Sequence, residues 1–115
     1  MQLDGKPLDD NEIERRRLLQ RLIDSEGRSA ISRAADDYRN AGFEFPDEQD
    51  VHLQLLAHFN ETLAGQAIQA LTGIVGREAV RKRPVLDQRL RRLEEYADER
   101  SIREAAATLR RRLRS

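Results

Sequence analysis

The sequence predicts an all-α protein of about six helices arranged in three antiparallel pairs. In six stretches of the chain, apolar residues recur at intervals of three and four, the spacing of one helix face. Six glycines and three prolines in 115 residues are too few for a protein of strands and turns. Aromatic residues make up only 4% of the chain, so the core must consist mainly of Leu, Ile, Val and Ala. The alternative fold is a compact bundle of five or six helices.

We expect residues 1–9 to form an extended arm and residues 10–115 to form a single helical domain. Asp9 with Glu12 three positions later is the pattern of a capping box and predicts a helix over about 10–24. A second helix is expected over about 28–40, with Ser29 as its cap. It should end at Gly42, since a glycine after the last turn adopts the left-handed conformation without strain.

A short loop then carries two large apolar residues, Phe43 and Phe45, followed by Pro46. We interpret them as side chains that fill a gap between helices, and the alternative is an exposed docking element. Two further helices are predicted over about 48–59 and 61–76, with Asn60 capping the second of them.

The last third begins with a basic segment, residues 77–83. Pro84 suits the first position of a helix because its missing N–H costs nothing there, and we expect that helix to run to about residue 97. Ser101 with Glu104 forms a second capping-box pattern, which predicts a final helix over about 102–114.

Each second helix of a pair shows the same short pattern, an aliphatic residue followed four positions later by alanine. The three instances are Ile31 with Ala35, Leu63 with Ala67 and Ile102 with Ala106. With this pattern, residues 48–115 resemble HEAT-type α-helical repeats, and residues 10–42 do so more weakly. The resemblance implies a stacked helical scaffold that binds a partner, usually a protein and occasionally nucleic acid, without catalytic residues. We expect the partner to dock on the second helices or on the ends of the stack.

Charge is balanced overall but unevenly placed. The chain has 21 basic and 21 acidic residues, and 19 of the basic residues are arginine. Residues 1–76 hold eight basic and 14 acidic residues, a net charge of −6, whereas residues 77–115 hold 13 and seven, a net charge of +6. The basic half can meet an acidic partner, and the two halves can attract each other in a homo-oligomer.

No residue pattern indicates catalysis, a cofactor or a metal site. The chain lacks cysteine, which excludes a thiolate nucleophile and a zinc–thiolate site. His52 and His58 are six residues apart, so they cannot form the i, i+4 pair of a metalloprotease helix, and we expect them to be partly exposed or to lie at an interface. The apolar stretches are too short to span a membrane, and the first residues lack the apolar core of a signal peptide. We therefore expect a cytoplasmic protein that is not an enzyme.

These observations favour a protein–protein interaction or adaptor module. The alternative is a nucleic-acid-binding helical domain that uses the arginine-rich region 77–114, although Tyr96 is its only aromatic residue for base stacking. The candidate partner-binding residues are Arg77, Arg81, Lys82, Arg83, Arg103, Arg110, Phe43 and Phe45.

Overall fold

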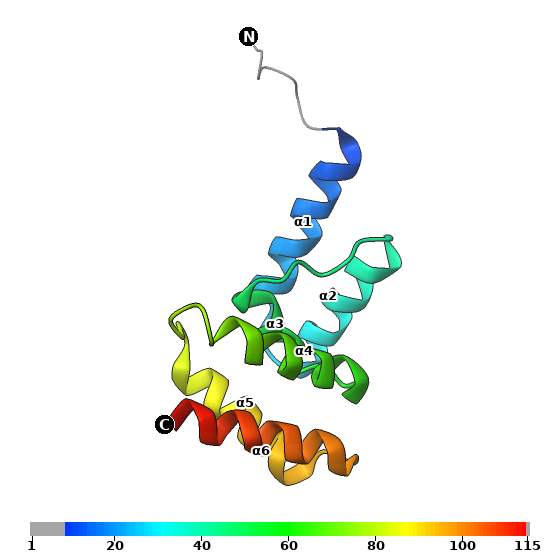
Figure 1. The fold of residues 1–115 in the computed structure, drawn as a ribbon. Helices are drawn as coiled ribbons and strands as arrows, with labels where there is room; N and C mark the ends of the chain where they lie inside the picture. The colour runs from blue at the N-terminus through cyan, green and yellow to red at the C-terminus, as the bar shows by residue number, and fades with distance from the viewer. Residues whose placement is uncertain (1–8, 115) are drawn as a thin grey trace.

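The computed structural model describes residues 9–114, which form six helices (Figure 1). The helices are α1 (Asp10–Asp24), α2 (Arg28–Asn40), α3 (Gln49–Leu55), α4 (Glu61–Ile74), α5 (Arg83–Tyr96) and α6 (Arg100–Arg114). No strand occurs between residues 9 and 114. The prediction of an all-α, six-helix protein is confirmed, and the arm expected over residues 1–9 lies, apart from Asp9, outside the described residues.

The helices pack mainly as sequential pairs. The most extensive contacts join α1 to α2, α3 to α4 and α5 to α6, while α3 contacts both helices of the first pair and α4 contacts α6. Figure 1 shows the α3–α4 pair lying between the other two pairs. The molecule measures 52 × 28 × 20 Å along its principal axes, and its long axis follows this order of the pairs.

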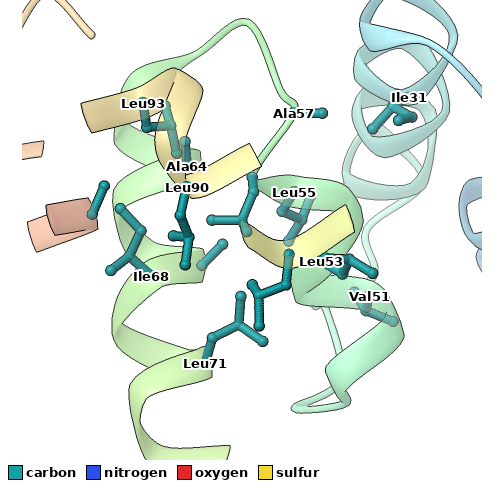
Figure 2. Close-up of a cluster of buried hydrophobic side chains, with 14 of the residues drawn as sticks. Ile31, Val51, Leu53, Leu55, Ala57, Ala64, Ile68, Leu71, Leu90 and Leu93 are labelled. Carbon is teal, nitrogen blue, oxygen red and sulfur yellow. The ribbon is translucent and has the colours of Figure 1, made fainter. Parts of the chain in front are cut away.

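The core is aliphatic and runs through all three pairs. Figure 2 shows Leu55 of α3 and Leu90 of α5 in one continuous cluster with side chains of α4 and α2. The three alanines of the repeated pattern, Ala35, Ala67 and Ala106, are completely buried. Small residues at these positions allow the helix backbones to approach one another.

Two of the predicted helix caps are present. The Asp9 carboxylate accepts the backbone N–H of Glu12 at 2.7 Å and starts α1. The Asn60 side chain accepts the N–H of Thr62 at 2.8 Å and starts α4. These side chains satisfy N–H groups that have no partner inside the helix.

The end of α2 follows the predicted glycine rule. Gly42 has a φ of 93°, and its N–H donates to the Arg39 carbonyl at 2.8 Å. The N–H of Phe43 reaches back to the Tyr38 carbonyl at 3.4 Å, which completes a Schellman motif. The Phe43 and Tyr38 rings pack with their centroids 5.4 Å apart, the apolar contact that accompanies this motif.

Three predictions of helix ends are wrong. Ser29 and Ser101 lie inside α2 and α6 and do not cap them. The residue before α2 is Gly27, with a φ of 87°, and the N–H groups of Asp98 and Glu99 before α6 bond to the Glu61 carboxylate at 2.6 and 3.1 Å. At the start of α6, the carboxylate of Glu61 on α4 therefore takes the capping role that was predicted for Ser101.

The helix expected over about 48–59 ends at Leu55. After Leu55 the N–H groups of Ala57 and His58 still bond to α3 carbonyls, at 2.9 and 3.1 Å, and residues 58 and 59 also bond to α2. The N–H of Phe59 donates to the Ser32 hydroxyl at 3.0 Å, and Nε2 of His58 lies 2.8 Å from Oδ1 of Asp36.

Candidate functional site

A cavity of about 310 Å³ opens between the start of α2 and the middle of α5. Its lining includes two buried apolar residues, Ile31 and Ala57, and three arginines, Arg28, Arg89 and Arg92. Gly27 and Gln88 complete it. We refer to this cavity as the arginine pocket.

The three arginines are held in place by the end of α3. Arg28 Nε donates to the Ala57 carbonyl at 3.1 Å, and Arg92 Nη2 donates to the Leu56 carbonyl at 3.2 Å. Arg89 Nη1 donates to the Leu53 carbonyl at 2.7 Å and to Gln54 Oε1 at 2.9 Å. The last carbonyls of a helix have no partner within it, so arginines from α2 and α5 supply the missing donors.

None of these three arginines has a carboxylate within 4.0 Å in the part of the chain that the structure describes. All the ion pairs found there involve other basic side chains. Burial lowers the pKa of Arg89. Burial also lowers the pKa of Arg92, an effect that the charges of Arg28 and Arg89 reinforce and the charge of Glu61 opposes. The pocket therefore concentrates three positive charges, and Glu61 acts on them only from beyond the 4.0 Å of an ion pair.

One exposed aromatic side chain contacts an arginine of the pocket, and another follows a pocket arginine by one helical turn. Phe59 is 57% exposed and Tyr96 is 73% exposed, although both are large apolar residues. Arg28 Cζ lies 4.8 Å from the centre of the Phe59 ring, within the range of a cation–π interaction. Tyr96 is one helical turn after Arg92 on α5, which places it on the same side of that helix. We call the surface formed by Arg28, Phe59, Arg89, Arg92 and Tyr96 the α2–α5 face.

The predicted candidates Phe43 and Phe45 lie elsewhere, in the loop between α2 and α3. They line a second cavity of about 410 Å³, which also includes His52 and Leu63. Both phenylalanine rings have their centroids 5.4 Å from that of Tyr38, and the ring of Phe45 is nearly parallel to it. The two side chains are half-buried, so they fill space beside Tyr38 and also border an open groove.

The basic connection before α5 is bonded to its surroundings. Lys82 is exposed and occupies the N-cap position of α5 without a side-chain capping bond. The three arginines of residues 77–83, the last of which begins α5, each have a partner: Arg77 has Asp47 at 3.3 Å, Arg81 has Asp50 at 3.8 Å, and Arg83 has the Leu113 carbonyl at 3.0 Å.

The two remaining predicted arginines brace α5 and α6. Arg103 donates to the carbonyls of Ala97 and Asp98 at 2.7 and 2.9 Å, at the end of α5. Arg110 bonds to Asp87 at 3.1 Å and to Glu94 at 2.8 Å, and its side chain is only 15% exposed. The structure therefore does not gather the predicted arginines into one site.

Both histidines are buried, contrary to the expectation of partial exposure. His58 Nδ1 accepts the N–H of Asn60 at 2.9 Å, so the proton must lie on Nε2, which donates to Asp36. His52 Nε2 lies 3.1 Å from Asp47 Oδ1, while its Nδ1 is buried without a partner. Burial lowers the pKa of His52, and the Asp47 carboxylate opposes this shift.

Residues 9–114 contain neither a cluster of metal ligands nor a membrane-spanning helix. No group of three or more His, Cys, Asp or Glu side chains is arranged to hold a metal ion. Within the same range, no helix combines the length and the apolar character needed to cross a membrane.

No protein-family model, curated protein or solved structure matches the chain. None of the five residues of the α2–α5 face is among the predicted partner-binding residues, although Arg89, Arg92 and Tyr96 lie within the arginine-rich region 77–114. The available signal was the spacing of Arg89, Arg92 and Tyr96, which repeats at three and four residues along one side of α5.

Proposed function

We propose that this protein is a non-enzymatic, cytoplasmic interaction module that binds another protein through the α2–α5 face. One observation carries the proposal. Three large apolar side chains are exposed in the described part of the chain, and two of them, Phe59 and Tyr96, lie on this face. Aromatic residues and arginine are the side chains that contribute most to binding energy at protein interfaces.

The packing of the face supports the same proposal. The end of α3 fixes Arg28, Arg89 and Arg92 by hydrogen bonds to backbone carbonyls before any partner arrives. Side chains that are ordered in the free protein lose less conformational entropy on binding. A stack of helix pairs, as the HEAT-like resemblance implies, would serve as the rigid scaffold. The sequence led us to expect docking on the second helix of each pair or on the ends of the stack. The α2–α5 face instead combines α2, the second helix of the first pair, with α5, the first helix of the last pair.

Nucleic-acid binding through residues 77–114 has less support. A phosphate backbone requires a row of available cations. Arg77, Arg81 and Arg110 instead have carboxylate partners, and Arg103 closes the end of α5.

The proposal is tested by capturing partners with the tagged full-length chain from lysate of the native source, divided into nuclease-treated and untreated halves. The test variant is Phe59→Ser/Tyr96→Ser. The matched control is Ile13→Ser, because Ile13 is the third exposed apolar residue, at 51%, and lies on α1.

We expect the wild type and the Ile13→Ser variant to capture the same protein. The double variant should bind it at least roughly 30-fold more weakly, since removal of a hot-spot aromatic costs about 2 kcal/mol or more. Equal binding by all three chains would refute the α2–α5 face, and material lost on nuclease treatment would favour nucleic acid.

A further inference from the structure

We propose that the arginine pocket receives the carboxylate of a glutamate side chain from the protein partner. This inference rests on the proposed function and identifies the chemistry of the segment that docks. The ligand class follows from the charge, the free donors and the shape of the pocket.

The first argument is charge. Arg28, Arg89 and Arg92 are close enough for the first two to disfavour the charged form of the third, yet no carboxylate lies within 4.0 Å of them among the described residues. Several arginines elsewhere in the fold do have such partners: Arg110 has two, and Arg15, Arg17 and Arg21 have one each. A bound anion would relieve the repulsion in the pocket and provide the partner that is absent there.

The second argument is the supply of donors. Each guanidinium uses one nitrogen for the α3 segment: Nε of Arg28, Nη1 of Arg89 and Nη2 of Arg92. Two nitrogens of each group therefore remain for other acceptors. Because bonds to the α3 segment already fix each group, the remaining N–H donors are positioned for the two oxygens of a carboxylate.

The third argument is shape. The cavity of about 310 Å³ combines the three cations with the buried side chains of Ile31 and Ala57. A glutamate side chain matches this combination, since its methylene groups can contact the apolar lining while its carboxylate meets the arginines. The exposed Phe59 ring beside Arg28 can pack against the neighbouring apolar residue of the partner.

A protein carboxylate fits this face better than a nucleic-acid backbone. Glu61 is close enough to Arg92 to affect its pKa, and Asp36 bonds to His58, the residue before Phe59. A continuous row of phosphates over this surface would approach both carboxylates. A single carboxylate in the pocket leaves the rest of the docking segment free to avoid them.

The test is a titration of the isotope-labelled full-length chain, followed by NMR at the Nε–Hε groups of Arg28, Arg89 and Arg92. The probes are the peptides acetyl-Leu-Glu-Leu-amide and acetyl-Leu-Gln-Leu-amide at millimolar concentrations. Inorganic phosphate and a short oligothymidylate form two further arms.

We expect saturable shifts with the glutamate peptide and none with the glutamine peptide. Arg92→Gln should weaken binding roughly tenfold or more, because it removes charge-assisted hydrogen bonds. Arg92→Lys retains a cation and should weaken it less. The control is Arg33→Gln, an exposed position on α2 with no ion pair or hydrogen bond to another described residue; it should bind like the wild type. Far-UV circular dichroism checks that each variant is folded.

The inference is overturned if both peptides bind equally, if neither moves the arginine signals, or if phosphate or the oligonucleotide binds these arginines more tightly than the glutamate peptide. These outcomes are separate from failure of the proposed function. A partner that is lost from Phe59→Ser/Tyr96→Ser but retained by Arg92→Gln would support the α2–α5 face and exclude a carboxylate in the pocket.

Discussion

Replacement of Gln54 by leucine should destabilise the fold strongly, although the two side chains have similar size. Gln54 is 7% exposed, and its Nε2 donates to the carbonyls of Leu22 and Ser25 at 2.8 Å each and of Ile23 at 3.3 Å. Its Oε1 accepts from Arg89 at 2.9 Å. This one amide therefore joins the end of α1 to α3 and α5.

The expected cost follows from what each partner retains. Leu22 still accepts the N–H of Ser25 at 3.2 Å, and Arg89 still donates to Leu53. The Ser25 carbonyl has no other hydrogen bond among the described residues to replace that of Gln54, and the Arg89 guanidinium loses one of two acceptors. Since each buried group left without a partner costs about 1–3 kcal/mol, we expect a total loss of about 3 kcal/mol.

Urea unfolding followed by far-UV circular dichroism measures this loss directly. A thermal scan should show a decrease in Tm of about 10 °C for a domain of this size. The control is Gln69→Leu on the exposed side of α4, which should change stability by less than about 0.5 kcal/mol. A cost below about 1 kcal/mol for Gln54→Leu would show that the amide does not join the three helices as described.

Three further predictions use the same unfolding assay. Gly73→Ala should stabilise the protein by about 0.5 kcal/mol, because a Cβ there meets only Arg77 Nη1 at 3.7 Å and alanine favours the helix. Gly42→Ala should reduce stability by about 1 kcal/mol, because the φ of 93° disfavours any side chain, although an added Cβ would meet no atom within 4 Å. A change in stability of the same sign for both glycine variants would contradict this reasoning. Burial lowers the pKa of His52, so the unfolded chain binds more protons below about pH 6.5 and stability should decrease as the pH falls through that region. His52→Gln should reduce this slope, and an unchanged slope would assign it to other groups.

Much of the fold could be predicted because its signals are local. The Asp9 cap, the Asn60 cap and the turn at Gly42 each depend on contacts within a few residues, and the structure contains all three. Pro84 likewise lies in the first turn of α5. The alternation of apolar and polar residues at helical spacing then fixes which side of each helix is buried.

Two of the three wrong helix ends involve contacts between distant residues. Phe59 leaves the helical path because its N–H meets Ser32, 27 residues earlier. The start of α6 is supported by Glu61 on α4, which no pattern near Ser101 could indicate. A local motif indicates whether a segment is helical. The residue at which the helix begins or ends depends on partners that are distant in the sequence and lie near only in the folded chain.

The site was harder to predict for the same reason. The density of arginines in residues 77–114 drew attention to that region, yet most of the chosen side chains hold the fold together. Arg28 is separated from Arg89 by about half the chain, and the two meet only because α2 and α5 both contact the end of α3. Composition indicates how many cations a chain has, whereas the fold decides which of them lack an anion.

Site-specific photocrosslinking tests the central claim most directly. A benzoylphenylalanine replaces Tyr96 in the full-length chain, and a second chain carries it at Ile13 as the matched exposed position. After irradiation in nuclease-treated lysate of the native source, we predict a crosslinked protein partner from position 96 and none from position 13. A partner crosslinked only from position 13 would contradict the assignment of binding to the α2–α5 face.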